Sequence, residues 1–530
     1  MPNLFELRAM TKDYFKVYPN VVKHPTVTLC LVAVATYLLL EAIYSLLFHP
    51  LRKIPGPFFA KLGQSWRNHK YIRGTWHDDC LKLHEQYGNV VRIAPNEISF
   101  VDEQGLGNLY GHGKRVLKTN WYDTWTVPDM SVSFFAATDI KVHRHVRSRV
   151  SGAYSMTSML SMEPLIQDVL NLNLTRLVGF ADKGEVVQID KWVNFFTFDI
   201  VGQLAMGSMI GFLEQGRDVN GIIQSVHDGF WIMSNMGYFP LQSYWINNSV
   251  SRFLIRHLGG RRLNAFNIFN DWVERQVDDR MRNGLRGARR DMLQHFIEAK
   301  DQNGNPVTKG DVVTEASNIL GAGADTTAIG ILAIIGNVIS NPRVMRKLQQ
   351  EIDQAHADLG LGKENRSFSF KELEKLPYLS AVITESTRLH PSIQYQLPRY
   401  VPKEGAQIGP YFIKEGAIAG ISPRSMNRSK EIFGEDADMF RPERWIPQNS
   451  EEERIVKQQA LLLTTFGMGS RSCVGKHLAT VEMYKYTAQF FFNFEAEPAR
   501  PERMWKIQTQ WFSMQEDFPI KISRRSQSKY

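Results

Sequence analysis

The sequence predicts a mainly α-helical fold with a small β-region, preceded by a single N-terminal transmembrane helix. Three observations predict this fold class. Residues 26–48 form a mostly apolar run, long enough to cross a bilayer core of about 30 Å. Apolar residues recur at helical spacing in long stretches such as 66–87, 222–236, 311–340 and 476–492. Two short segments, 90–94 and 97–101, have the alternating pattern of a β-hairpin.

The N-terminal region is predicted to lead through an anchor and a hinge into one globular domain. The segments are a polar stretch 1–25, a transmembrane anchor 26–48, a proline-rich hinge 49–57 and the globular domain 58–530. A cleaved signal peptide would have a shorter apolar core nearer the start of the chain. Glu41 interrupts the apolar run, so a monotopic anchor that does not fully span the bilayer is the alternative. Basic residues flank both ends of the run and do not settle its orientation.

Composition limits the class of protein. No low-complexity linker or internal repeat divides the 530 residues, so one large unit is expected after the hinge. Cys30, Cys80 and Cys473 are odd in number and far apart, which predicts no disulfide framework and a cytosolic globular part. The net charge of +9 includes no aromatic-interleaved basic stripe, so nucleic acid is not an expected partner. A basic surface toward anionic lipid or an acidic protein is expected instead.

The loop 466–475 is the strongest functional signal in the chain. A helix is predicted to begin at Lys476, which places Cys473 at a helix N-terminus, where the backbone N–H groups and the helix dipole favour a thiolate. The glycines of the loop allow sharp turns and a close approach to something flat. Arg471 adds a positive charge suited to an acidic group on a bound partner.

A single cysteine ligand excludes most metal sites. A zinc site needs several cysteine or histidine ligands, and none lies near enough in sequence, whereas one thiolate suits haem iron. A buried cysteine in a glycine-rich turn is the alternative. The order and spacing of the loop resemble the cysteine-ligand signature of the cytochrome P450 family, and the residues that carry the match are Phe466, Gly469, Arg471, Cys473 and Gly475.

The resemblance extends over nearly the whole chain from the hinge onward and implies a cytochrome P450 fold. It implies haem b as cofactor, with Cys473 as the axial ligand of the iron, whose thiolate favours O–O cleavage. The implied reaction is that of a haem-thiolate monooxygenase, which inserts one oxygen atom from O2 into an apolar small molecule by hydroxylation, oxidation or demethylation. It also implies a single-pass protein of the endoplasmic reticulum membrane, with its catalytic domain on the cytosolic side.

Electrons are expected from a separate protein, because the chain has no glycine-rich dinucleotide motif. The resemblance implies NADPH–cytochrome P450 reductase as this partner, with cytochrome b5 as a second candidate donor. Its expected docking face is the basic surface that includes Lys141, Arg144 and Lys476.

The predicted helix 311–340 contains Gly321-Ala322-Gly323-Ala324-Asp325-Thr326-Thr327. Each glycine costs about 1 kcal/mol in a helix interior, and close helix packing would explain the glycines alone. It does not explain Asp325 beside Thr326. The family resemblance implies that this motif bends the helix over the haem, that Thr326 contacts dioxygen and that Asp325 connects Thr326 to solvent.

Further matches concern the haem edge and the scaffold behind it. His143 and Arg147 lie at i, i+4 in a basic helical segment, for which a solvated surface helix is the alternative. The resemblance implies that Arg147 and Arg399 hold haem propionates and that His143 takes a position often held by tryptophan. It implies a structural network that fixes the cysteine loop, formed by Glu385, Arg388 and Arg444.

The substrate pocket is the least legible part of the sequence. The family resemblance assigns the loop 105–135 and the segment 212–239 to its cover, and Ile393, Tyr395, Leu397 and the turn 509–514 to its wall. Tyr154-Ser155-Met156 and Met162-Glu163-Pro164 are most similar to fungal members near the pisatin demethylase-like group. This similarity implies secondary metabolism, with a terpenoid, polyketide, alkaloid or phytoalexin-like substrate.

Two other functions stay open from the sequence. One is a haem-thiolate isomerase or dehydratase that needs no reductase, which the intact Asp325-Thr326 pair disfavours. The other is a non-catalytic haem-binding membrane receptor.

Overall fold

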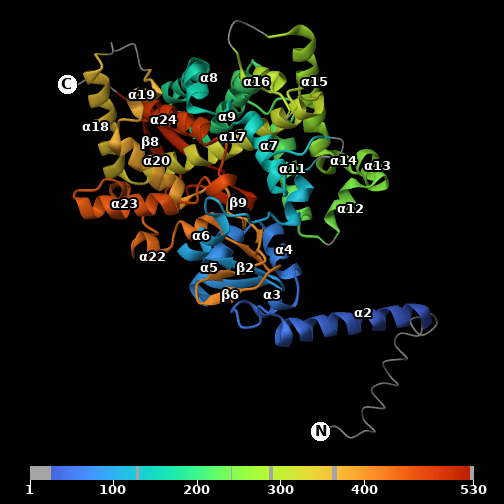
Figure 1. The fold of residues 1–530 in the computed structure, drawn as a ribbon. Helices are drawn as coiled ribbons and strands as arrows, with labels where there is room; N and C mark the ends of the chain where they lie inside the picture. The colour runs from blue at the N-terminus through green and yellow to red at the C-terminus, as the bar shows by residue number, and fades with distance from the viewer. Residues whose placement is uncertain are drawn as a thin grey trace.

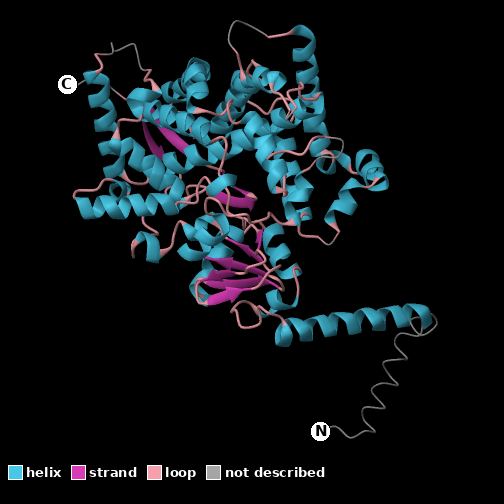
Figure 2. Cartoon of the chain, viewed as in Figure 1, coloured by secondary structure: helices cyan, strands magenta, loops and turns pink. Residues whose placement is uncertain are grey.

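The computed structural model describes residues 25–126, 130–239, 241–285, 290–301, 303–360 and 367–525. Apart from Pro25, the predicted polar segment 1–25 lies outside the described residues. The chain is mainly helical with small sheets (Figures 1 and 2), which confirms the predicted fold class.

The predicted anchor is an exposed apolar helix. Helix α2 (Pro25–Ile43) is followed by a π-helical turn, η1 (Tyr44–Phe48), and Figure 1 shows α2 extending away from the rest of the molecule. The stretch Thr26–Phe48 is long and apolar enough to cross a membrane. Helix α17 (Lys309–Ile339) passes the same test, but it is mostly buried and belongs to the core.

The turn η1 is hydrogen-bonded to the small β-region. The guanidinium of Arg92, which is fully buried in strand β1 (Val90–Ala94), donates to the backbone oxygen of Ser45 at 3.0 Å and to its hydroxyl at 2.8 Å. The hydroxyl of Ser45 in turn donates to the carbonyl of Lys61. The last residues of the predicted anchor therefore pack against the globular domain.

The strands form four small sheets. The largest has the order β1-β2-β7-β4, with β1 and β2 as an antiparallel hairpin and β7 parallel to β2. Its predicted hairpin is confirmed, although the second strand ends at Phe100. The strands are β1 (Val90–Ala94), β2 (Glu97–Phe100), β3 (Val187–Gln188), β4 (Arg399–Tyr400), β5 (Ala406–Ile408), β6 (Tyr411–Ile413), β7 (Ile418–Gly420), β8 (Phe494–Pro498), β9 (Lys506–Gln510), β10 (Phe512–Glu516) and β11 (Pro519–Arg524).

Helices make up most of the remaining described chain. They are α3 (Phe58–Leu62), α4 (Ser65–Ile72), α5 (Trp76–Tyr87), α6 (Glu103–Tyr110), η2 (Asn120–Trp125), α7 (Ile140–Val150), α8 (Met156–Lys183), α9 (Ile189–Met206), α10 (Phe212–Gln215), α11 (Ile222–Met236), α12 (Gln242–Asn247), α13 (Ser249–Leu258), α14 (Gly260–Leu263), α15 (Ala265–Asn283), α16 (Met292–Glu298), α17 (Lys309–Ile339), α18 (Pro342–Asp358), α19 (Phe370–Leu373), α20 (Pro377–Leu389), α21 (Pro423–Met426), α22 (Lys430–Phe433), η3 (Pro442–Trp445), α23 (Ser450–Leu462), η4 (Gly469–Arg471) and α24 (Lys476–Asn493).

One segment that was predicted as a single helix forms two helices in the structure. The segment from Trp66 to Tyr87 is two helices, α4 and α5, because the chain turns at Gly74, whose φ of +72° lies in the left-handed region. The predicted helix 222–236 coincides with α11, and the helix predicted to begin at Lys476 is α24.

Helix α17 runs through the core. A capping box formed by Thr308 and Asp311 starts it. A Cβ atom at Gly321 would lie 3.3 Å from the ring of Phe230, and one at Gly323 would lie 3.4 Å from Val201. Close packing against α11 therefore favours glycine at position 321, whereas a Cβ at position 323 would make an ordinary contact with α9.

Candidate active site

A large cavity lies between α17 and the cysteine loop 466–475. Cys473 and Thr326 are both part of its wall. Much of the remaining wall is apolar, and its residues include Trp125, Phe134, Phe230, Ile393, Leu397 and Phe512. The cavity can therefore take an apolar molecule beside a thiol and a hydroxyl.

The backbone of the cysteine loop is tightly folded. The amide of Cys473 donates to the carbonyl of Phe466 at 2.8 Å. Gly467 and Gly469 have φ of +67° and +65°. A Cβ atom at Gly469 would lie 2.2 Å from the carbonyl oxygen of Tyr110, so only glycine fits there. Gly475 caps the N-terminus of α24.

Cys473 is exposed toward the cavity, and protein atoms surround the rest of its side chain. This burial raises its pKa, although the backbone N–H of Gly475 and the charges of Arg147 and Lys476 act in the opposite direction. The backbone N–H at the helix N-terminus thus favours the thiolate, as expected from the sequence, but burial has the larger effect on the pKa. A bound metal ion would supply the missing driving force, since coordination deprotonates a thiol outright.

Four cationic side chains line one part of the cavity without a carboxylate partner. In the described part of the chain, none of them forms an ion pair with an acidic residue. Arg147 donates to the carbonyl of Ser472 at 2.7 Å, Arg471 to that of Ala137 at 2.6 Å, Lys118 to that of Phe135 at 2.5 Å, and Arg399 to the hydroxyl of Tyr122 at 3.0 Å.

Lys118 was not singled out by sequence reasoning. It forms an isolated β-bridge with Arg399, 281 positions away, and it lies in a region without a clear period. Burial, together with the charges of Arg399, Arg471 and Arg147, holds its pKa well below the ordinary value. A cluster of this kind is arranged for an anionic ligand, because its charges repel one another until an anion binds.

His143 lies beside the cationic cluster and also lines the cavity. Burial, and then the charges of Arg471 and Lys118, lower its pKa to about 3. The imidazole is therefore neutral at physiological pH, with one N–H available as a donor.

The structure places Asp325 and Thr326 on different sides of α17. Thr326 lines the cavity, and its hydroxyl donates to the carbonyl of Ala322 at 2.7 Å. Asp325 is not part of the cavity wall and is only 1% exposed. Its Oδ1 lies 2.9 Å from Nε2 of His227 on α11. The expected connection of Thr326 to solvent through Asp325 stays a prediction; Asp325 itself is buried, and the partly exposed His227 lies next to it.

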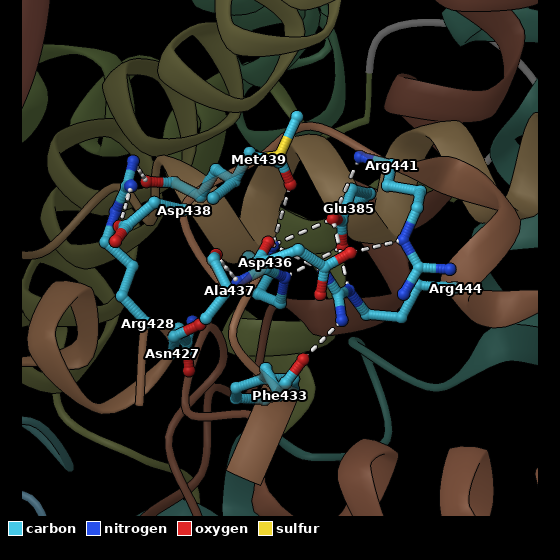
Figure 3. A network of polar contacts seen from close by, with 12 residues as sticks. Glu385, Asn427, Arg428, Phe433, Asp436, Ala437, Asp438, Met439, Arg441 and Arg444 are labelled. Atoms are coloured by element: carbon cyan, nitrogen blue, oxygen red, sulfur yellow. Dashed lines mark hydrogen bonds and ion pairs between the residues drawn. The ribbon is translucent and has the colours of Figure 1, made fainter. Parts of the chain in front are cut away.

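Glu385 is the centre of a buried polar network behind the cysteine loop (Figure 3). Arg388 binds both of its carboxylate oxygens, at 2.8 and 2.7 Å, and Nε of Arg444 lies 3.4 Å away. The carboxylate also accepts from the indole of Trp445 at 2.9 Å and from the amide of Arg441 at 3.2 Å. The residues predicted as the scaffold thus lie together.

Asn427 connects this network to the cysteine loop. Arg388 donates to the backbone carbonyl of Asn427 at 2.7 Å. The side-chain oxygen of Asn427 accepts from the amide and hydroxyl of Thr464, at 2.9 and 2.8 Å, and its amide donates to Thr465 at 3.1 Å. Since Phe466 follows directly, the network can hold the start of the loop. Asn427 carries no local sequence signal.

The predicted substrate wall is partly as expected. Ile393, Leu397, Trp511 and Phe512 line the cavity. Tyr395 does not line it: the ring is fully buried and stacks on Tyr71 at 3.9 Å, so its assignment to the wall is wrong. In a regular strand, residues 393, 395 and 397 would all point to the same side. The chain bends at Ser392 and Tyr395 instead of forming a strand, and Tyr395 is turned away from the cavity. From α11, Val226 and Phe230 face the cavity.

Comparisons with known proteins agree with this geometry. Residues 51–523 match the model of the family "Cytochrome P450". A cytochrome P450 monooxygenase of Aspergillus terreus is 34% identical over 82% of this chain and 88% of its own length. Pisatin demethylase of Fusarium vanettenii is 31% identical over 91% and 90%, and the Emericella nidulans cytochrome P450 monooxygenase cicH is 30% identical over 90% and 94%. The predicted resemblance is confirmed: the chain belongs to the cytochrome P450 family of haem-thiolate monooxygenases.

Proposed function

We propose that this monooxygenase inserts one oxygen atom from O2 into an apolar small molecule of fungal secondary metabolism, such as a terpenoid, polyketide or alkaloid. The observation that carries the proposal is the cavity itself, in which Cys473 and Thr326 share a wall with aromatic and aliphatic side chains. The fungal relatives support the metabolic setting.

The residues of the cavity fit haem b. Cys473 would hold the iron, and the unpaired cations Arg147, Arg399, Arg471 and Lys118 fit the two propionate groups. The neutral imidazole of His143 would donate its N–H to a propionate. Bound haem would supply the activation of dioxygen. Gly469 keeps the loop backbone close to Tyr110, and the network around Glu385 keeps the loop in place.

The roles of the protein side chains follow from their positions. The hydroxyl of Thr326 faces the cavity and would orient dioxygen and hold a proton there. Asp325, on the other side of α17, would carry protons toward Thr326. The apolar wall excludes water and favours an apolar substrate.

The proposal includes the partners and the location. NADPH–cytochrome P450 reductase, with cytochrome b5 as a second donor, would supply electrons across the exposed basic face that includes Lys141, Arg144 and Lys476. Helix α2 would anchor the chain in membrane lipid of the endoplasmic reticulum as a single span, with the domain on the cytosolic side.

The test first measures the absorption spectrum of the haem and then the formation of product. The reduced protein should give the thiolate-type band with carbon monoxide, and Cys473→Ala should abolish it. Candidate compounds that shift the haem band are then incubated in reductase-containing membranes. NADPH-dependent product supports the proposal, whereas product without NADPH would indicate an isomerase or dehydratase. A spectral shift without oxygen consumption would indicate a receptor.

Thr326→Ala separates oxygen activation from haem binding. The variant should keep the carbon monoxide band and consume NADPH while forming less product and more hydrogen peroxide. Full coupling of NADPH use to product in this variant would contradict the proposed role of the hydroxyl.

A further inference from the structure

His227 connects a buried acid to the outside of the molecule. It lies on α11, and its Nε2 is 2.9 Å from Oδ1 of Asp325 on α17. The Asp325 side chain is 1% exposed and the His227 side chain is 21% exposed. Neither residue is part of the cavity wall, so the exposed part of His227 faces away from the cavity. The imidazole thus stands between the carboxylate and solvent.

The carboxylate has a second, unused oxygen. Oδ2 of Asp325 is buried and has no hydrogen-bond partner among the described residues. A buried carboxylate oxygen without a donor is costly, so a water or another proton carrier is needed at this atom. One oxygen of Asp325 is therefore held by the solvent-facing histidine while the other is free to act elsewhere.

We propose that His227 is the positioning residue through which Asp325 exchanges protons with solvent. The inference rests on the proposed function, because it supplies the solvent end of the proton route assigned there to Asp325 and Thr326. It also replaces the direct solvent access that the burial of Asp325 rules out.

The exchange is balanced in protons and charge. The imidazolium of His227 gives its Nε2 proton to Oδ1 of Asp325, which leaves a neutral imidazole and a neutral carboxylic acid. Rotation of the carboxyl group brings that proton to the free side, from which it leaves. His227 then turns toward solvent and takes one proton from water at Nε2. One proton has entered and one has left, and both side chains recover their charges.

The surroundings of His227 keep it charged near neutral pH. Burial acts to lower its pKa, but the carboxylates that face it act more strongly, and the net shift is upward. These carboxylates are Asp325 of α17, Glu516 of β10 and Asp218 of the loop before α11. The neighbouring Val226 and Phe230 line the cavity, so a ligand that displaces α11 would also disturb the contact between His227 and Asp325.

The first arm of the test needs no turnover. The full chain, labelled with ¹³C at histidine Cε1 and held in lipid nanodiscs, is titrated by NMR, and His227→Gln assigns the signal. Asp325→Asn should lower the pKa of His227 by at least about one unit. An unchanged pKa in Asp325→Asn would show that the two groups do not interact and would overturn the inference.

The second arm measures proton supply with dioxygen itself as the probe. Reduction of O2 to hydrogen peroxide takes two electrons and two protons, and it is driven by NADPH and purified reductase without added substrate. His227→Gln keeps a donor for Asp325 but cannot exchange a proton. It should slow peroxide formation at least about tenfold and remove the fall in rate that the wild type shows as pH rises through the pKa of His227.

The controls separate the possible failures. His69→Gln changes an exposed histidine of α4 and should retain the wild-type rate and pH profile. A His227→Gln variant with the carbon monoxide band and the wild-type pH profile would overturn the inference and leave the proposed function standing. A wild-type protein without that band would overturn the proposed function, while the NMR arm would still report on the pair.

Discussion

Replacing Glu385 by alanine should destabilise the protein far more than its sequence spacing suggests. Glu385 and Arg388 are separated by three positions on α20, and both side chains are 0% exposed. Removing the carboxylate leaves the buried guanidinium group of Arg388 without its anion, whereas Arg444 keeps its ion pair with Asp436 at 3.0 Å. Breaking a buried ion pair in this way typically costs about 3–5 kcal/mol, against a total stability of about 5–15 kcal/mol for a domain.

The chain contains a matched control for this substitution. Glu451 and Arg454 have the same i, i+3 spacing and a similar distance of 2.7 Å, but their side chains are 65% and 67% exposed. Glu451→Ala should therefore be indistinguishable from the wild type, because water screens the pair.

Thermal inactivation, followed by loss of the carbon monoxide band, provides the measurement. If the network is broken in the unfolding transition state, the loss in Glu385→Ala corresponds to a rate increase of roughly 10²–10⁴-fold, at about 1.4 kcal/mol per factor of ten. Equal inactivation rates for Glu385→Ala and Glu451→Ala would refute the reasoning, because burial would then make no difference to the pair.

Three further predictions concern the loop, the core and the anchor. Gly469→Ala should abolish the carbon monoxide band, because a Cβ atom at this position would lie 2.2 Å from the carbonyl oxygen of Tyr110. Gly467 has a similar φ, but a Cβ atom there would have no neighbour closer than 3.7 Å. Gly467→Ala should therefore lower the free energy of unfolding by only roughly 1–2 kcal/mol in melting experiments. Burial raises the pKa of Glu315 from 4.5 to about 7. The protonated carboxyl group therefore contributes its full stabilisation below pH 4.5, and this contribution is lost as pH rises through 7. Glu315→Gln should remove this pH dependence of stability, of order about 3 kcal/mol, from melting curves. Deletion of residues 1–48 should lower the melting temperature relative to deletion of residues 1–43, because only the longer deletion removes Ser45, which accepts hydrogen bonds from the buried Arg92. Each buried donor left without an acceptor costs about 1–3 kcal/mol. Equal melting temperatures would show that the contact between Ser45 and Arg92 does not stabilise the protein.

Local sequence signals predicted the elements that carry the chemistry. Glycines with positive φ around Cys473, and the capped apolar helix that contains Asp325 and Thr326, are each specified within a few residues of chain. The hairpin β1–β2 and helix α11 are also local, and the structure confirms them. The break at Gly74 was missed because a glycine inside a helical period does not by itself show that the helix ends.

Contacts between distant segments could not be predicted in this way. Lys118 meets Arg399 across 281 positions, and Asn427 meets Thr464 across 37. Neither Lys118 nor Asn427 differs in its local pattern from an ordinary surface residue. Their roles exist only after folding brings cations to one side of the cavity and a side-chain amide beneath the cysteine loop.

Contacts between distant segments also decide how Asp325 and Thr326 are connected, although both were predicted from the sequence to belong to one proton route. Adjacent residues on an α-helix point about 100° apart, so an acid beside a threonine need not face the same space as the threonine. The structure turns Thr326 toward the cavity and Asp325 toward α11. A proton that passes between them must therefore go around the helix backbone, and it needs a carrier on each side of Asp325. His227 occupies the solvent side, and the unpaired Oδ2 marks the other. The sequence contains the helix period, but only the packing of α17 against α11 shows that Asp325 faces away from the cavity and that His227 lies beside it.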